Sequence, residues 1–219
     1  TVQRWNNTNG RKKAIEHKGS FQEWKMVTVV MAENTTTLYL DGQEAAVQTE
    51  EVMPLDGIIT ATSKFMIGKA NWEGGEYYTG LIDDFTIFDG ALSEAQVKAY
   101  YDETLVSEGD TEPKPLAVYD FENGLGEGVS QVVSGTKGST PAAYTGEAVF
   151  AEGRPAQDGQ AAGKAVKVGG PKNQKDGYGL KLNHTNLGTE YTASMWVRPD
   201  ENNKLPNNMT VLFIGKPNP

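Results

Sequence analysis

Hydrophobic and polar residues alternate at every second position along most of this chain, which is the period of a half-buried β-strand. The segment WKMVTVVMA at 24–32 carries bulky side chains on both faces, which predicts a central strand. Asp41-Gly42 is a dipeptide favoured in two-residue type I′ turns, so a hairpin is expected there. The other main predicted strands lie at 37–40, 43–47, 64–68, 116–121, 163–168, 179–182, 191–197 and 210–214.

One stretch of the chain favours a helix. Ser93 and Gln96, which follow Asp89-Gly90, have the spacing of a capping box, in which the serine accepts from the glutamine's backbone N–H. Apolar residues then recur at three- and four-residue steps, at Val97, Tyr100, Tyr101 and Leu105. The sequence therefore predicts an all-β protein with one short helix near 93–104.

Residues 106–115, VSEGDTEPKP, have the composition of a linker, because they are rich in glycine, proline and acidic residues. They separate residues 1–105 from residues 116–219. The predicted strands of the two parts do not repeat in the same order, so a simple duplication is not expected.

The net charge of −9 and the lack of cysteine limit the possible functions. A nucleic-acid partner is not expected, because binding to phosphates needs clustered lysine and arginine. Disulfides, thiolate nucleophiles and cysteine zinc sites are excluded. No apolar run is long enough to insert into a membrane. A cysteine-free β-protein rich in glycine, asparagine and threonine favours an extracellular or cell-surface location in a bacterium.

Eight segments share the pattern of one known family, namely WKMVTVV, TLYLDG, FMIG and GLIDDFTIF in the first part, and LAVYDFENG, GKAVKV, YTASMWVRP and TVLFIG in the second. They resemble the laminin-G-like (concanavalin A-like lectin/glucanase) jelly-roll module of bacterial surface proteins and multimodular glycosidases. The resemblance implies an antiparallel jelly-roll sandwich of two sheets.

The order of these segments differs from that of the resembled family. Residues 1–105 resemble the C-terminal half of a module, and residues 116–219 resemble the N-terminal half of the next. The resemblance implies that the halves complement each other as one sandwich, either permuted within one chain or swapped between the chains of a homodimer. It also implies that the strand at 80–88 pairs with the strand at 116–121.

Catalytic residues are not predicted. A glycosidase needs two carboxylates at a defined separation, and the best spacing match, Glu108 to Glu112, falls in the linker, where no strand is expected. The two histidines, His17 and His184, are not accompanied by a Gly-x-Ser-x-Gly motif. The chain itself is expected to be non-catalytic, although its parent protein could be a glycoside hydrolase.

Sugar binding in such modules uses flat aromatic rings together with amides or carboxylates. Trp72 lies in a glycine-rich loop with Asn71 and Glu76 nearby, and Tyr77 follows. Trp5, which precedes several asparagines, is a second candidate. The structural alternative for Trp72 is a loop aromatic that folds onto its own sheet.

A structural calcium ion is the only cofactor considered, because Ca²⁺ prefers hard oxygen ligands. Asp83 and Asp84 are adjacent on one predicted strand, so their side chains are expected on opposite faces. Asp120 and Asn123 follow the strand expected to pair with it, and are the other candidate ligands. The alternative is that these residues cap turns and face water.

These observations predict a non-catalytic carbohydrate-binding module of a larger secreted glycoside hydrolase or surface protein, with a glycan or polysaccharide as partner. The alternative is a structural spacer or a protein-binding adhesion module without a sugar site.

Overall fold

The structure is a computed structural model of the 219-residue chain. It describes residues 5–6, 10–11, 15–52, 54, 64–69, 78–105, 112–133, 142–143, 146–155, 162–169, 178–182, 187–201 and 211–215. The chain divides into two compact units, which are described separately. Unit 1 consists of Thr1–Ile59, Asp84–Val118 and Leu187–Val197, and unit 2 consists of Thr60–Asp83, Tyr119–Asn186 and Arg198–Pro219.

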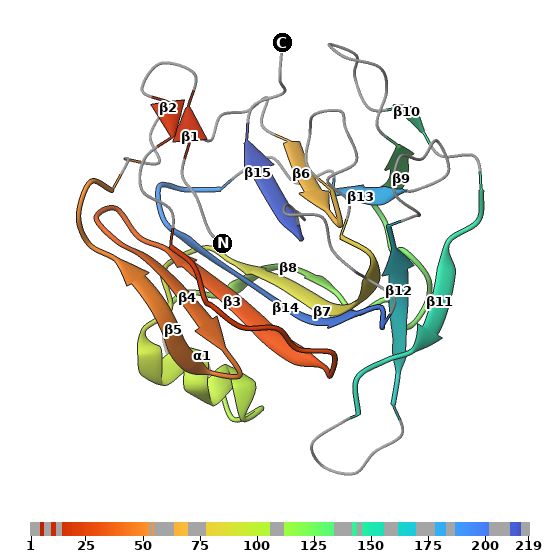
Figure 1. Ribbon diagram of the computed structural model, residues 1–219, viewed down its shortest axis with the longest axis horizontal. Helices are drawn as coiled ribbons and strands as arrows, with labels where there is room; N and C mark the ends of the chain where they lie inside the picture. Colours follow the sequence, from red (N-terminus) through yellow and green to blue (C-terminus); the bar gives the residue numbers. More distant parts are fainter. Residues whose placement is uncertain are drawn as a thin grey trace. The chain divides into compact units, whose positions relative to one another are not determined.

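Unit 1 contains an antiparallel run of strands in the order β14-β3-β4-β5. Figure 1 shows β3 (Lys25–Met31), β4 (Thr36–Leu40) and β5 (Gln43–Gln48) next to one another. β14 (Tyr191–Pro199) pairs with β3 over seven residues, from Tyr191↔Met31 to Val197↔Lys25. The central position predicted for the segment 24–32 is confirmed, because β3 is hydrogen-bonded on both sides.

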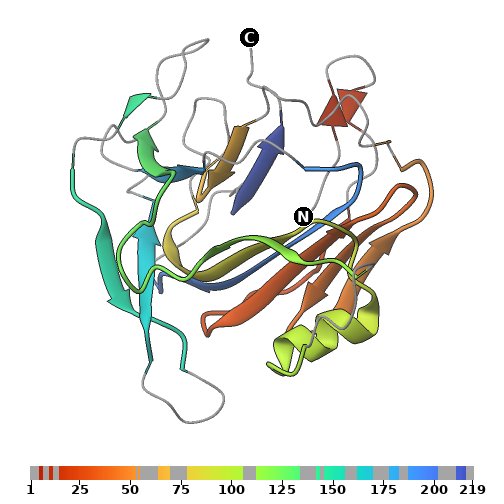
Figure 2. The ribbon, with the colours of Figure 1, turned by 180° about the vertical axis from the view of Figure 1, so that it is seen from behind.

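The one helix among the described residues, α1 (Glu94–Tyr101), begins as predicted and ends a few residues earlier than expected. Ser93 caps it, and both bonds of the capping box with Gln96 are present. Val97 packs into a buried cluster, whose other members are Val30, Tyr39, Phe88 and Leu92. Figure 2 shows α1 from the opposite side to Figure 1. α1 therefore stabilises unit 1 through the face that carries Val97.

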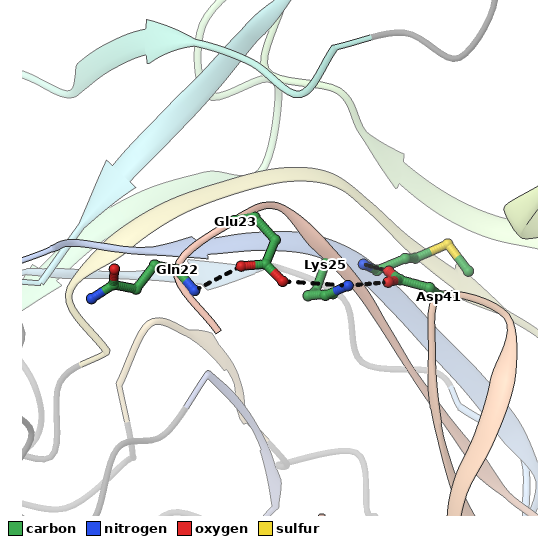
Figure 3. Close-up of polar contacts among 5 residues, drawn as sticks. Gln22, Glu23, Lys25 and Asp41 are labelled. Atoms are coloured by element: carbon green, nitrogen blue, oxygen red, sulfur yellow. Dashed lines mark hydrogen bonds and ion pairs between the residues drawn. The ribbon is translucent and has the colours of Figure 1, made fainter. Parts of the chain in front are cut away.

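The β4–β5 hairpin has the predicted two-residue turn. Asp41 and Gly42 have φ of 50° and 74°, the two positive values that a type I′ turn requires. Asp41 also accepts hydrogen bonds from the backbone N–H of Met26 at 2.9 Å and from Lys25 Nζ at 2.7 Å. Figure 3 shows these contacts together with Glu23, whose carboxylate lies 3.5 Å from Lys25 Nζ. The turn is thus joined to the start of β3.

Three shorter strands make two further pairings. β1 (Trp5–Asn6) pairs with β2 (Gly10–Arg11). β8 (Pro115–Tyr119) pairs with β7 (Gly80–Phe88), so the pairing expected between the segments at 116–121 and 80–88 is confirmed. Two hydrogen bonds hold the start of β8. Lys114 N donates to Asp89 Oδ1 at 2.6 Å, and Asp89 N donates to the Lys114 carbonyl at 3.0 Å.

Unit 2 contains a five-stranded sheet in the order β10-β9-β13-β6-β15. Its strands are β6 (Lys64–Ile67), β9 (Val129–Val133), β10 (Ala142–Ala143), β13 (Gly179–Leu182) and β15 (Leu212–Gly215). The strands β9 and β10 were not predicted, because they lie in a Gly-, Ser- and Thr-rich stretch with weak alternation. Phe65, Ile67 and Leu180 are fully buried and form part of the core of unit 2.

The remaining strands of unit 2 form a hairpin, one strand of which pairs with the first residues of β7. β11 (Val149–Glu152) pairs with β12 (Lys164–Val168), and β12 pairs with Gly80–Ile82. The hydrogen-bonded order of the larger sheet is β11-β12-β7-β14-β3-β4-β5. Its pairs β11–β12, β12–β7, β14–β3, β3–β4 and β4–β5 are antiparallel. The predicted class, an all-β protein with antiparallel sheets and one short helix, is confirmed in the described residues.

Candidate functional site

Most of the predicted sugar-binding residues lie outside the described residues, namely Asn71, Trp72, Glu76 and Tyr77. Trp5 belongs to β1, opposite Arg11, and its side chain is outside the described part of the structure. The assignment of these five residues to a sugar site therefore stays a prediction.

Asp83 is the most deeply buried of the predicted calcium ligands, with 3% of the residue exposed. Its Oδ2 accepts a hydrogen bond of 3.0 Å from the backbone N–H of Arg154. Gly153 lies directly against the same oxygen, since a Cβ at this position would be 2.6 Å from Oδ2. The carboxylate of Asp83 therefore contacts the segment that follows β11.

Glu122 makes a similar arrangement on the other side of the β11–β12 hairpin. Its Oε1 accepts a hydrogen bond of 2.8 Å from the backbone N–H of Lys164, and Lys164 Nζ donates to the Glu122 carbonyl at 3.1 Å. A Cβ on Gly163 would lie 1.8 Å from Oε1, which no real atom can do. A side chain at position 163 would therefore displace the Glu122 carboxylate from the backbone N–H of Lys164.

A backbone hydrogen bond of 2.8 Å from Gly153 N to the Gly163 carbonyl connects the two halves of this arrangement. We call Gly153, Arg154, Gly163 and Lys164 the hairpin base. At each end of the base, a carboxylate lies over a glycine and accepts the N–H of the next residue. Sequence reasoning missed this role. The available signal was the repeated pair of a glycine followed by a cation, Gly153-Arg154 and Gly163-Lys164.

Tyr178 joins the opposite end of the same hairpin. Its hydroxyl accepts a hydrogen bond of 3.2 Å from Val149 N and donates to the carbonyl of Lys167. Val149 and Lys167 are paired residues of β11 and β12. The hairpin is therefore connected at both ends to side chains that lie outside it.

Asp120 and Asn123 are exposed and belong to a turn. Asp120 Oδ1 accepts from the backbone N–H of Glu122 at 3.2 Å, which is the geometry of an Asx turn. Phe121 has a φ of 59° and is buried, so the backbone turns sharply between Asp120 and Glu122. For Asp120, this is the turn-capping role that was the alternative to metal binding.

Asp84 has a φ of 45°, a left-handed conformation that aspartate tolerates better than most residues. The prediction that Asp83 and Asp84 point to opposite faces assumes extended backbone, and that assumption does not hold at a left-handed residue. Within the described residues, no group of three or more histidine, aspartate or glutamate side chains could hold a metal ion. The calcium site stays a prediction.

Lys69, at the end of β6, is a buried cation that the sequence did not single out. It is 1% exposed, and its aliphatic stem lies against Gly179, where a Cβ would be 2.5 Å from Lys69 Cγ. Burial disfavours the charged form and lowers the pKa of Lys69 from 10.5 to about 8. This amine can therefore lose its proton under mildly alkaline conditions.

The acids and histidines considered for catalysis do not gain support from the geometry. His17 is exposed. His184, Glu108 and Asp110 are outside the described residues. No helix among the described residues has the length and apolar character needed to cross a membrane.

Comparison with known proteins identifies one family. Residues 2–98 match the model of the concanavalin A-like lectin/glucanases superfamily. The resemblance inferred from the sequence is thereby confirmed over this range, which falls within residues 1–105. A comparison with curated proteins gave no match.

Proposed function

We propose that this chain is a non-catalytic carbohydrate-binding module that belongs to a larger secreted glycoside hydrolase or surface protein. The observation that carries the proposal is the match of residues 2–98 to a superfamily of lectins and glucanases, together with an antiparallel sandwich of the corresponding type.

The binding residues in this proposal are Trp72 and Trp5, with Asn71, Glu76 and Tyr77 beside Trp72. An indole ring offers a flat apolar face to a pyranose ring, and the amide and carboxylate offer hydrogen bonds to hydroxyl groups. The ligand class is a neutral polysaccharide, because the chain carries a net charge of −9 and would repel a polyanion.

The test measures binding of the full chain to beads that carry xylan, arabinan, galactan or β-glucan. Binding to at least one of them is expected, with a loss of about 10- to 30-fold in affinity for Trp72→Ala or Trp5→Ala, the scale of a truncated aromatic anchor. Val118→Ser is the control, because Val118 is 59% exposed and its replacement removes apolar surface away from both tryptophans in the sequence.

Two results would contradict the proposal. Equal losses in Trp72→Ala, Trp5→Ala and Val118→Ser would indicate unspecific adhesion. A chain that binds none of the polysaccharides but captures a protein partner would support the spacer or adhesion module instead. Hydrolysis of a polysaccharide by the chain would contradict the non-catalytic part alone.

A further inference from the structure

The turn at residues 121–124 contains an asparagine that is followed directly by a glycine. Gly124 N donates to the Phe121 carbonyl at 3.2 Å, so Glu122 and Asn123 are the central residues of the turn. Asn123 is exposed, and its side chain makes no hydrogen bond or ion pair in the part of the chain that the structure describes. The amide carbon of Asn123 is therefore open to attack by a neighbouring group.

The neighbouring group is the backbone nitrogen of Gly124. Once this nitrogen has given its proton to solvent, it can bond to Asn123 Cγ and close a five-membered succinimide ring. The bond from Cγ to Nδ2 then breaks, and the side-chain nitrogen leaves as ammonia. Water opens the ring at either of its carbonyls, which leaves an aspartate or an isoaspartate at position 123. The chain gains one negative charge, and water is the only co-reactant.

The glycine at position 124 leaves its nitrogen accessible, because no Cβ lies beside the reacting bond. Its φ is 105°, and a Cβ added there would have no atom within 4 Å. Gly126, with a φ of 79°, has the same open surroundings, and Gly128 also has a positive φ, of 75°. The backbone that follows Asn123 can therefore rotate without a clash with the described residues.

One contact opposes the reaction. The hydrogen bond from Gly124 N to the Phe121 carbonyl must open before the nitrogen can attack, and Phe121 itself is buried. At 3.2 Å this bond is at the long end of the range for N–H···O bonds. Because an exposed turn opens locally at a small cost in free energy, the bond slows the reaction without preventing it.

We propose that Asn123 is a site of spontaneous deamidation in the folded chain, and that it reacts faster than Asn34. Asn34 is also exposed, in the connection between β3 and β4, but the residue that follows it is Thr35. The branched Cβ of threonine crowds its own backbone nitrogen, so the ring closes more slowly there. The product adds a carboxylate to a turn that already contains Glu122. The proposal is independent of sugar binding.

Mass spectrometry of tryptic peptides measures the reaction at each asparagine. Trypsin releases residues 99–137, in which Asn123 is the only asparagine, since the bond between Lys114 and Pro115 resists cleavage. It also releases residues 26–64, in which Asn34 is the only asparagine. The full chain is kept in a mildly alkaline buffer, and a second sample is kept in the same buffer with guanidinium chloride. In the folded chain, the 99–137 peptide is expected to gain about 1 Da several-fold faster than the 26–64 peptide.

Asn123→Gln is the matched control, because a glutamine at this exposed position would have to close a six-membered ring. This variant should lose the mass gain in the 99–137 peptide and leave the 26–64 peptide unchanged. A folded chain whose 99–137 peptide gains no mass would overturn the proposal, and a gain in guanidinium chloride alone would show that the turn protects Asn123. Equal rates in the two peptides, or a gain that persists in Asn123→Gln, would also overturn it.

Discussion

The two hairpins β4–β5 and β11–β12 are held in different ways. The β4–β5 hairpin closes through Asp41-Gly42, and the side chain of Asp41 contacts residues 15 and 16 positions away. The base of the β11–β12 hairpin is held by Asp83 and Glu122, which lie 71 and 42 positions from their backbone partners. The first hairpin is therefore stabilised by its own turn residues, and the second by carboxylates from distant parts of the chain.

The difference separates a hairpin that its own turn residues specify from one that depends on residues distant in the sequence. A type I′ turn is favoured by the conformational preferences of two residues, so its sequence signal is local. A hairpin base that depends on acceptors distant in the sequence has no such local signal. Its glycines matter because carboxylate oxygens from those distant residues approach them closely. Substitutions at the two hairpins should therefore differ in size and in what rescues them.

The largest effect is expected for Gly163→Ala. The new methyl group would lie 1.8 Å from Glu122 Oε1, so the carboxylate must move and the hydrogen bond from Lys164 N is lost. The expected loss is about 2 to 3 kcal/mol in the free energy of unfolding, mainly the cost of overpacking, with a smaller part from the loss of an exposed hydrogen bond. Urea denaturation followed by tryptophan fluorescence measures it.

Gly188→Ala is the control for this prediction, because its nearest neighbour would be an ordinary 3.8 Å away. The double variant Gly163→Ala/Glu122→Ala should recover part of the loss, since it removes the colliding carboxylate. Equal effects of Gly163→Ala and Gly188→Ala would show that Glu122 does not hold the hairpin base.

A smaller loss is expected for Asp83→Ala, about 2 kcal/mol, because the N–H of Arg154 would lose its acceptor in a buried place. Asp83→Asn retains an acceptor oxygen of nearly the same shape and should cost less than half as much. The same urea denaturation curves measure both variants. Similar losses for the two substitutions would mean that the negative charge, and not the hydrogen bond, is what the site needs.

The same two variants separate the hairpin base from the predicted calcium site. If Asp83 also ligates calcium, addition of about 1 mM CaCl₂ raises the melting temperature of the unchanged protein by mass action and fails to do so for Asp83→Asn. If the unchanged protein melts at the same temperature with CaCl₂ and with a chelator, the calcium prediction is wrong, and the role of Asp83 at the hairpin base is unaffected.

The elements with local signals could be predicted from the sequence. The capping box of α1 and the turn at Asp41-Gly42 each depend on residues a few positions apart, and both are present as expected. The strand β3 was predicted because bulky residues occupy both of its faces. The strands β9 and β10 were missed, because their pairing with each other and of β9 with β13 provides what their own sequence lacks.

The candidate site was less predictable for a related reason. Asp83 was predicted as a calcium ligand, which stays a prediction. The partner that the structure shows for it is the backbone N–H of Arg154, and a backbone partner leaves no trace in residue types. Nothing in the sequence distinguished Glu122 from Asp120, although the close approach to Gly163 makes Glu122 the more constrained of the two. Backbone partners and close contacts to glycine become visible only when the strands are assembled.

A moderate effect is expected at the local hairpin for Gly42→Ala, about 1.5 kcal/mol. Gly42 has a φ of 74°, which an L side chain disfavours, and the added methyl group would lie 2.9 Å from Tyr101 Cβ. Gly42→Asn tests the two causes separately with the same denaturation curves, because asparagine tolerates positive φ but still meets Tyr101. A loss for Gly42→Asn as large as for Gly42→Ala would assign the effect to the contact with α1.

The smallest effect is expected for Lys25→Met, about 0.5 kcal/mol, because the ion pair with Asp41 is partly exposed and screened by solvent. The hydrogen bond to Asp41 raises the pKa of Lys25 above its ordinary value of 10.5. The folded state therefore holds this proton more tightly than the unfolded chain does, and the stabilisation is fully present below pH 10.5 and is lost as pH rises through the folded pKa. Urea denaturation of both proteins between pH 8 and pH 12 measures the difference. A difference that stays constant to pH 12 would show that the aliphatic stem of Lys25, and not its charge, stabilises the β4–β5 hairpin.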